Sequence, residues 1–244
     1  MIRVVDRMSR LLDAFTPEAA EHTLTELAHA TGLNKSSAYR LLTSMEAIGL
    51  VEHRDLRWRI GPRPVALANV RLGSLDLRRE ALHHLRELRQ VFRAAIAFSV
   101  PDGSDMIYLE RLDSPDAYGV SARLGARAPI WSGASGKAAL SRMTPPEREA
   151  RLDVEAWRRL PRQLRNRVMK RIAEAERRGY CVDTGEFFDG IGGVAAAICD
   201  PHGAPVAAIS VIAPAERLTR EYVHSTADRL LAATAELEAT LQTH

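Results

Sequence analysis

The stretch from residue 24 to residue 42, LTELAHATGLNKSSAYRLL, constrains the fold more than any other because it has the pattern of a helix-turn-helix. Thr23 followed three residues later by Glu26 predicts a capping box that starts a short helix. Ala28 is small where two helices must cross, Gly32 stands where the chain needs a left-handed turn, and Asn34 can cap a second helix. The apolar residues of the second helix recur at helical spacing and should face the first helix: Ala38, Leu41, Leu42 and Met45.

The second helix leaves a polar front, which is the part of a helix-turn-helix that enters the major groove of DNA. Its members are Lys35, Ser36, Ser37, Tyr39 and Arg40. A helix-turn-helix also occurs as a structural hairpin, so the motif favours DNA binding without excluding plain packing.

Two short strand-like runs follow, at residues 50–53 and 57–60, and predict a hairpin of the kind that forms the wing of a winged helix. Trp58 should be buried against the helices rather than stacked on a base. The candidate phosphate donors of this wing are His53, Arg54, Arg57 and Arg59. An ordinary solvated surface would explain these arginines as well.

A first helix is expected over residues 4–15, with an apolar stripe at Val4, Met8, Leu11, Leu12 and Phe15. Part of the stripe must cover the helix-turn-helix, and the remainder can pair two copies, since one helix-turn-helix reads only a half-site. Core packing alone explains the stripe equally well, and the sequence leaves both interpretations open.

Length and composition agree with two ordinary domains. The chain has 244 residues, a hydrophobic content of 46% and a net charge of +3. Cys181 and Cys199 lack the spacing of a metal site, so we expect no metal or other cofactor and reduced thiols. Without a signal peptide or a long apolar run, the protein is expected to be cytoplasmic, with no membrane partner.

After Gly61 the pattern changes to a linker helix over residues 65–72, a break near Gly73, and a second helix over 76–93. The apolar stripe of that second helix is Leu77, Ala81, Leu85, Leu88 and Phe92. Beyond it we predict strands at 95–100, 106–112, 118–124, 180–183, 193–199 and 205–212, and helices at 135–142, 146–152, 161–178 and 219–241. About six strands with interspersed helices and terminal hairpins predict an α+β fold with an antiparallel sheet.

Two segments of this second region have the character of a binding site. Residues 131–137, WSGASGK, are small residues that open a helix, where free N–H groups attract a carboxylate. The spacing excludes a phosphate-binding P-loop, because Trp131 occupies the position of the first glycine. The second segment runs from Asp183 to Glu186 and on through the glycines of 190–193. We expect one of these two acids to be solvated and the other to face a ligand, although glycines at a strand entrance also serve tight turns.

Together these segments resemble the IclR family of bacterial transcription factors, over nearly the whole chain. The resemblance rests on TELAHATGLNKSSAYRLLTSMEAIGLVE, WRIGPR, SGKAAL and RRGYCVDTGEFFDGIGGVAAAICDPHGAPVAAISVIAP. It implies a winged helix at residues 1–61, a linker helix at 62–75, and an effector-binding domain of GAF-like or profilin-like fold at 76–244. It also implies homodimers or dimers of dimers on double-stranded promoter DNA, usually as repressors that respond to small organic or aromatic acids.

Carried over position by position, the family's effector pocket includes Ala134 and Ser135 at the helix start, Asp183, and Ser210 on the last strand. Many members have cysteine where this chain has Gly193, and a second serine where it has Ile212. The resemblance therefore implies a roomier, more apolar pocket, suited to an aromatic or longer aliphatic acid rather than a very small keto acid.

Two other classes of protein fit the sequence less well. An enzyme lacks support, because the chain has no Gly-x-Ser-x-Gly elbow, no zinc spacing and no carboxylate pair with a plausible base between them. A structural DNA-binding protein without a ligand would not need so elaborate a second domain. The expected mechanism is linkage, in which an effector binds unequally to two arrangements of the paired recognition helices.

Overall fold

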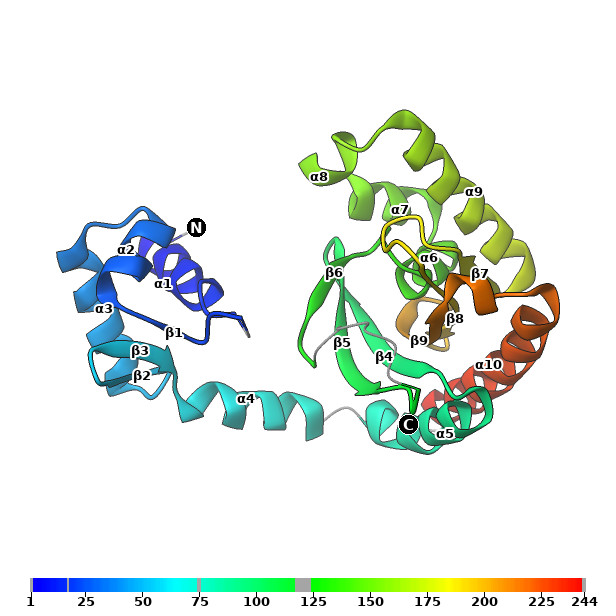
Figure 1. Ribbon diagram of the computed structural model, residues 1–244, viewed down its shortest axis with the longest axis horizontal. Coiled ribbons are helices and arrows are strands. Elements are labelled where there is room, and N and C mark those ends of the chain that lie inside the picture. Colours follow the sequence, from blue (N-terminus) through cyan, green and yellow to red (C-terminus); the bar gives the residue numbers. More distant parts are fainter. Residues whose placement is uncertain (1, 17, 74–75, 117–123, 243–244) are drawn as a thin grey trace. The chain divides into compact units, whose positions relative to one another are not determined.

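The computed structural model describes residues 2–16, 18–73, 76–116 and 124–242. By its internal contacts the chain divides into two compact units, Met1–Ser74 and Leu75–His244 (Figure 1). Within the described ranges, no helix combines the length and the apolar character required to span a lipid bilayer.

The first unit combines helices with a small antiparallel sheet. Its elements are α1 (Arg3–Asp13), β1 (Glu21–His22), α2 (Leu24–Thr31), α3 (Lys35–Ala47), β2 (Val51–Arg54), β3 (Arg57–Ile60) and α4 (Pro62–Gly73). The strands lie in the order β1-β3-β2, so β1, which the sequence did not predict, pairs with the outer side of the wing. The core of this unit consists of Leu11, Leu27, Leu42, Met45, Val51 and Trp58.

The local signals of the helix-turn-helix are confirmed. Thr23 and Glu26 form the capping box of α2, and Gly32 ends that helix with a φ of 67°. The Asn34 side chain accepts a hydrogen bond from the backbone N–H of Ser37 at 2.8 Å and so caps α3. The hairpin turns through Asp55 and Leu56, both with positive φ, as the right-handed twist of a two-residue hairpin requires.

The second unit is built on one six-stranded sheet. Its strands are β4 (Ala95–Asp102), β5 (Asp105–Leu112), β6 (Arg127–Pro129), β7 (Tyr180–Asp183), β8 (Ile191–Cys199) and β9 (Pro205–Pro214). They lie in the order β6-β5-β4-β9-β8-β7, and every neighbouring pair is antiparallel. Its helices are α5 (Asp76–Phe92), α6 (Ala134–Ser141), α7 (Pro145–Leu152), α8 (Glu155–Arg158), α9 (Arg162–Arg178), the short 3-10 helix η1 (Ala215–Arg217) and α10 (Arg220–Leu241).

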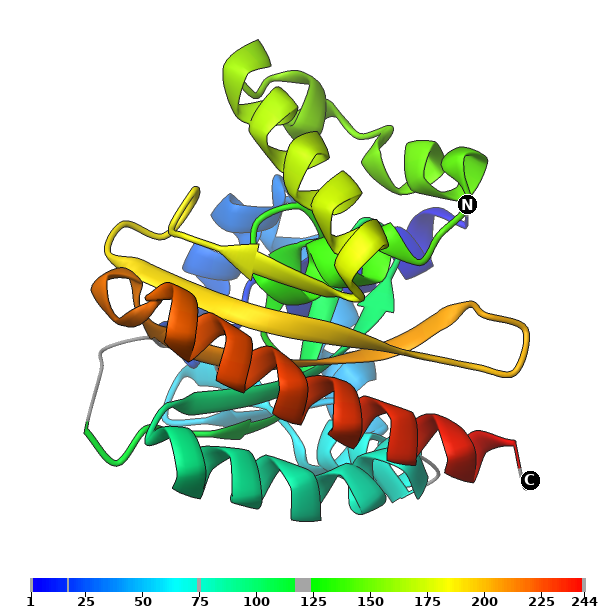
Figure 2. The ribbon, with the colours of Figure 1, turned by 90° about the vertical axis from the view of Figure 1, so that its right-hand side faces the viewer.

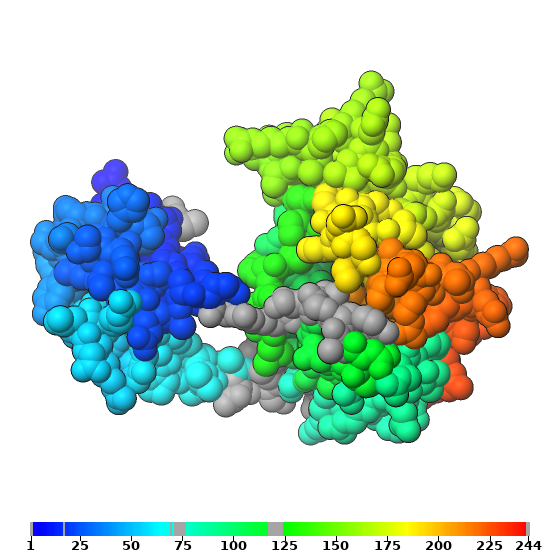
Figure 3. Space-filling view, in the orientation of Figure 1, coloured from blue at the N-terminus to red at the C-terminus, as the bar shows by residue number. Residues whose placement is uncertain are grey.

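The helices divide between the two faces of this sheet. Figure 2 shows α5 and α10 side by side along one face, where their apolar stripes meet Ile96 and Phe98 of β4. The other face carries α6 and α9, and the α7–α9 region projects from the surface of the unit in the space-filling view (Figure 3). The α+β prediction with an antiparallel sheet is therefore confirmed.

Some details differ from the predictions. The strand expected at 118–124 falls almost wholly on residues 117–123, which lie outside the described ranges. The sixth strand of the described sheet is β6, a three-residue edge strand whose Arg-Ala-Pro sequence has no strand-like alternation. The short helices α8 and η1 were also not predicted, because three or four residues are too few for helical periodicity to show.

Candidate functional site

The polar front of α3 is open to solvent. Lys35, Ser36, Tyr39 and Arg40 are exposed, and Ser37 is half-buried beside the N-cap. The opposite side of the helix buries Ala38, Leu42 and Met45, with Leu41 half-buried, as the spacing predicted. The structure thus places the candidate base-reading residues on one side of α3, all of them exposed except the half-buried Ser37.

The structure places the predicted wing residues in different surroundings. Trp58 is buried as expected, and the ring of His53 stacks on it with 4.5 Å between the ring centroids. Arg54 and Arg57 are exposed. Arg59 is half-buried, pairs with the Glu52 carboxylate and lies 3.7 Å from that of Glu21, so neighbouring acids already neutralise its charge.

The start of α4 is closely joined to the end of α3. The Arg63 N–H donates to the carbonyl oxygen of Gly49 at 3.0 Å, and its guanidinium donates to that of Ile48 at 3.2 Å. Gly61 leaves no room for a side chain, because a Cβ there would lie 2.4 Å from the Gly49 oxygen. This contact fixes the direction in which α4 leaves the winged helix.

In the second unit, one cavity of about 550 Å³ brings together all the predicted effector-binding residues. They come from the start of α6, the end of β7, the start of β8 and the end of β9: Ala134, Ser135, Asp183, Gly193, Ser210 and Ile212. All but the half-buried Ile212 are buried in the folded chain, including the three polar residues Ser135, Asp183 and Ser210. The residues inferred from family resemblance therefore surround a single space.

The N-terminus of α6 opens onto this cavity. Its N-cap is Gly133, which has no side chain to accept from the first-turn N–H groups. Those groups have no intrahelical acceptor, so they carry partial positive charge toward the cavity. Gly136 allows the helix to lie directly on the turn before it, since a Cβ there would be only 1.9 Å from the Ile130 carbonyl oxygen.

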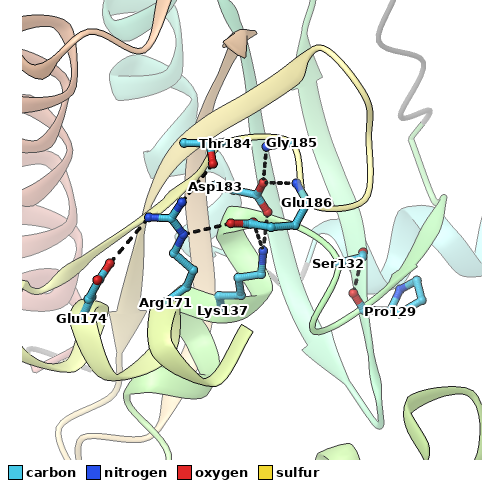
Figure 4. A network of polar contacts seen from close by, with 9 residues as sticks. All are labelled: Pro129, Ser132, Lys137, Arg171, Glu174, Asp183, Thr184, Gly185 and Glu186. Atoms are coloured by element: carbon cyan, nitrogen blue, oxygen red, sulfur yellow. Dashed lines mark hydrogen bonds and ion pairs between the residues drawn. The ribbon is translucent and has the colours of Figure 1, made fainter. Parts of the chain in front are cut away.

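Asp183 belongs to a buried charge network (Figure 4). Its Oδ2 accepts from Lys137 Nζ at 2.5 Å, and its Oδ1 accepts from the N–H groups of Gly185 and Glu186. Lys137 Nζ also donates to Glu186 Oε2 at 2.7 Å. The expectation of one solvated and one ligand-facing acid was wrong, because the Glu186 side chain is only 4% exposed. Both carboxylates lie in the interior, where each forms an ion pair with Lys137.

Burial and ion pairing shift the pKa values of this network in different directions. Burial raises the pKa of Asp183, although the charge of Lys137 opposes that shift. Burial also acts against ionised Glu186, but hydrogen bonds with Asp183, Lys137 and Arg171 and the charge of Lys137 lower its pKa to about 2. Glu186 is thus the carboxylate whose negative charge is best stabilised.

Several cavity residues were missed by the sequence analysis. Tyr108 from β5 lines the cavity, and burial raises its pKa while the Ser135 side chain partly opposes that change. Phe187 and Phe188 form an apolar wall, next to Ile191. The paired aromatic residues between Asp183 and the glycines were a usable signal, whereas nothing local to Tyr108 distinguishes it from other strand residues.

Gly193 has a packing role besides leaving room. A Cβ at this position would lie 2.9 Å from the carbonyl oxygen of Val211 on β9, so a larger residue requires a small shift of the strand pair. Ile212 adds an apolar side chain to the same wall of the cavity. The two departures from the family pattern thus meet on adjacent, paired positions of β8 and β9.

The described residues contain no cluster of His, Cys, Asp or Glu side chains that could hold a metal ion. Cys181 and Cys199 are both free thiols and both buried, and burial raises the pKa of Cys181 to about 12. A thiol with so high a pKa is unreactive at neutral pH.

Each of the two units matches a known family of protein domains. Residues 4–55 match the model of the IclR helix-turn-helix domain, and residues 70–239 match that of the bacterial transcriptional regulator IclR C-terminal domain. The chain is 26% identical to the HTH-type transcriptional regulator XynR of Escherichia coli over 86% of each chain. It is 28% identical to the acetate operon repressor of Salmonella typhimurium, over 91% of this chain and 84% of that one.

Solved structures agree with this relationship. An IclR homologue from Microbacterium hydrocarbonoxydans, complexed with 4-hydroxybenzoate, has a TM-score of 0.83 and 26% identity, covering 99% of this chain and all of that one. A transcriptional regulator from Rhodococcus has a TM-score of 0.80 and 26% identity over 100% and 99% of the two chains. The curated relatives are regulators of transcription and not enzymes. The chain therefore belongs to the IclR family of DNA-binding bacterial transcriptional regulators.

Proposed function

We propose that the cavity at the start of α6 binds a monocarboxylic acid with an aromatic or longer aliphatic body, and that its occupancy changes the affinity of the protein for promoter DNA. The observation that carries this proposal is the convergence of six predicted residues on one cavity of about 550 Å³. That volume lies within the range of small-molecule sites, about 300–1,000 Å³.

The carboxylate of the effector is assigned to the N-terminus of α6. The first-turn amides there face the cavity, and Gly133 brings no side chain of its own to cap them. Asp183 repels an anion less than an isolated carboxylate would, because Lys137 and two N–H groups already compensate its charge. The hydroxyls of Ser135 and Ser210 supply further polar contacts.

The body of the effector is assigned to the apolar walls. Phe187, Phe188, Ile191 and Ile212 offer surface that a keto acid of two or three carbons would leave uncovered. Each Å² of apolar surface removed from water is worth roughly 25 cal/mol, so a ring is favoured over a small acid. The related protein with 4-hydroxybenzoate makes that compound the natural first probe.

On the DNA side, the exposed front of α3 and the wing residues Arg54 and Arg57 are assigned to base and phosphate contacts. We propose a winged-helix domain at residues 1–61, a linker at 62–75 and an effector domain at 76–244, paired as a homodimer or a dimer of dimers that represses its target. The contacts of Arg63 with the end of α3 support a role for α4 in transmitting the effector signal. Typical coupling between two sites is about 1–3 kcal/mol, or roughly 5- to 150-fold in DNA affinity.

A substitution series at Gly133 tests the carboxylate assignment. This N-cap has an extended backbone, and a Cβ there would meet no atom within 4 Å, so side chains are accommodated. Gly133→Asp places a carboxylate over the α6 amides and should weaken 4-hydroxybenzoate binding by more than tenfold in calorimetry. Gly133→Asn should weaken it less, and Gly133→Ala should have little effect. Unchanged binding by Gly133→Asp would show that the carboxylate of the effector does not bind at the start of α6.

Ser135→Trp tests the link between the cavity and DNA. The indole fills the space beside the α6 start, so the variant should bind operator DNA as the parent does but lose its response to 4-hydroxybenzoate. Ser135→Ala is the matched control, and it should retain the response. A Ser135→Trp variant that still responds, measured by fluorescence anisotropy of labelled operator, would remove Ser135 from the site.

A further inference from the structure

The β7–β8 loop, residues 184–190, forms one wall of the cavity through Phe187, Phe188 and Asp189. It has little apolar anchoring at its far end, since Phe188 is 51% exposed. Gly185 and Gly190 adopt positive φ, and glycine has the largest backbone freedom to lose on ordering. Apolar packing anchors only part of this wall, because Phe187 packs against a hydrophobic core cluster of the unit whereas Phe188 does not, so further contacts are needed to hold the rest of the loop.

Charged side chains supply that anchor. Lys137 Nζ, fully buried on α6, contacts Glu186 of the loop at 2.7 Å and lies 5.6 Å from the ring centroid of Phe187. From the other side, Arg171 of α9 donates from Nε to Glu186 Oε1 at 2.9 Å and from Nη2 to Thr184 Oγ1 at 2.9 Å. Figure 4 shows Glu186 between these two cations, with its carboxylate turned inward.

We infer that Lys137, Glu186 and Arg171 are positioning residues of the effector site: they hold the β7–β8 loop as a preformed wall and so set the affinity for the effector. The inference rests on the proposed function of the cavity. None of the three is among the residues that line the cavity, and Arg171 is the informative member because it contacts the loop at two residues from α9.

The physical reason is the cost of ordering the loop. When a binding-competent conformation is only partly populated, the apparent dissociation constant rises by the inverse of its population. With the network intact the loop is held before the effector arrives. With Arg171 removed, Glu186 keeps Lys137 but loses its outer partner, and the effector must then order the loop at the expense of its own binding free energy.

The experiment compares Arg171→Met with Lys170→Met in the full-length protein. Both residues lie on α9, and Lys170 is exposed. Hydrogen exchange of the effector-free proteins should show faster exchange across residues 184–190 in Arg171→Met and unchanged exchange in Lys170→Met. Calorimetry with 4-hydroxybenzoate should show roughly three- to tenfold weaker binding for Arg171→Met alone, with unchanged circular dichroism.

A second variant removes the charge of Glu186 while keeping the size of its side chain. Glu186→Gln keeps the size of the side chain but removes the charge shared by Lys137 and Arg171, and it replaces one of the two accepting oxygens by an amide NH2 donor. It should also accelerate exchange in the loop, and Arg171→Met in its background should add little, because both changes remove the same interaction.

Unchanged loop exchange in Arg171→Met, or an equal change in Lys170→Met, overturns the inference. If the parent protein does not bind 4-hydroxybenzoate, the effector assignment is at fault, and exchange in the effector-free protein still decides whether the network holds the loop. If the parent binds and Arg171→Met loosens the loop without losing affinity, the wall does not contribute to binding and the inference fails.

Discussion

In the first unit the residues assigned to base contacts lie close together in sequence along α3 and are mostly exposed, whereas in the second unit the cavity is lined from β5, α6, the β7–β8 loop, β8 and β9. The charges differ in the same way. Lys35 and Arg40 are exposed, but Lys137 is wholly buried between two carboxylates. A contiguous, exposed surface tolerates replacement of single side chains, while an assembled interior site depends on backbone contacts and paired charges.

The two helix N-termini make the contrast specific. Asn34 closes the start of α3 with its own side chain, while Gly133 leaves the start of α6 open to the cavity. At the start of α3, a side chain of the chain itself therefore accepts from a first-turn N–H group. At the start of α6, no side chain caps the first-turn N–H groups, so they can donate to a bound ligand.

The strongest test of this contrast is Gly136→Ala. The new Cβ would meet the Ile130 carbonyl at 1.9 Å, and backbone cannot yield as a flexible side chain does. We expect a loss of about 3 kcal/mol or more in the unfolding free energy of the second unit, at the upper end of overpacking effects. Urea unfolding measures it in a Trp58→Phe background, which leaves the tryptophans of the second unit as the fluorescent probes. Gly133→Ala, placed in open space, is the control, and a loss below 1 kcal/mol in Gly136→Ala would show that the contact can relax.

The next largest effect concerns acid stability. Because the folded-state pKa of Glu186 is about 2, below its ordinary 4.5, its stabilising contribution is present above about pH 4.5 and is lost as the pH falls toward 2. The shift corresponds to at most about 3 kcal/mol. Asp183 acts oppositely, since its raised pKa contributes stability at low pH that is lost as the pH rises.

Glu186→Gln should therefore flatten the loss of stability between pH 5 and pH 3, measured by urea unfolding of the second unit. The exposed Glu149 provides the control as Glu149→Gln, which should retain the slope of the parent. Equal slopes in all three proteins would mean that the Glu186 charge is not stabilised by the network.

A smaller effect is expected on the DNA side. Arg40→Ala should reduce discrimination between an operator selected from a random DNA pool and a scrambled sequence by about 1–3 kcal/mol, as for a bidentate contact with guanine. Arg59→Ala should change discrimination much less, because its guanidinium is already paired with Glu52. Anisotropy titrations at fixed salt measure both. A parent-like Arg40→Ala would show that the groove is read by other residues.

The smallest effect is the cap of α3. Asn34→Ala removes the acceptor for the Ser37 N–H and should lower the stability of the first unit by about 1 kcal/mol. In a Trp131→Phe, Trp157→Phe background the fluorescence of Trp58 reports it, since that side chain lies in the core of the same unit, and the Trp58→Phe background reports the second unit. A loss confined to the first unit would confirm that its stability is local, and a loss in the second unit would contradict the division.

The site of the first unit could be predicted from the sequence more fully than that of the second, because its residues are close together in the chain. Thr23, Gly32 and Asn34 act on neighbours within four residues, so their roles were visible in the sequence. The segments around Ala134 and Asp183 were visible in the sequence as separate candidate sites, but only the family resemblance joined them to each other and to Ser210, because no local pattern brings the three together. Lys137 was overlooked because a lysine in a small-residue helix looks solvated until its two carboxylate partners, 46 and 49 residues away, are seen.

The contact between Gly61 and Gly49 turns α4 into a lever arm. A helix of 12 residues is about 18 Å long, so rotating it by about 10° about its far end displaces the end that is fixed to the winged helix by about 3 Å. Successive base pairs of a DNA strand are about 3.4 Å apart. If two chains pair as proposed, a rotation of about this size would shift one reading helix by nearly one base-pair step relative to the other.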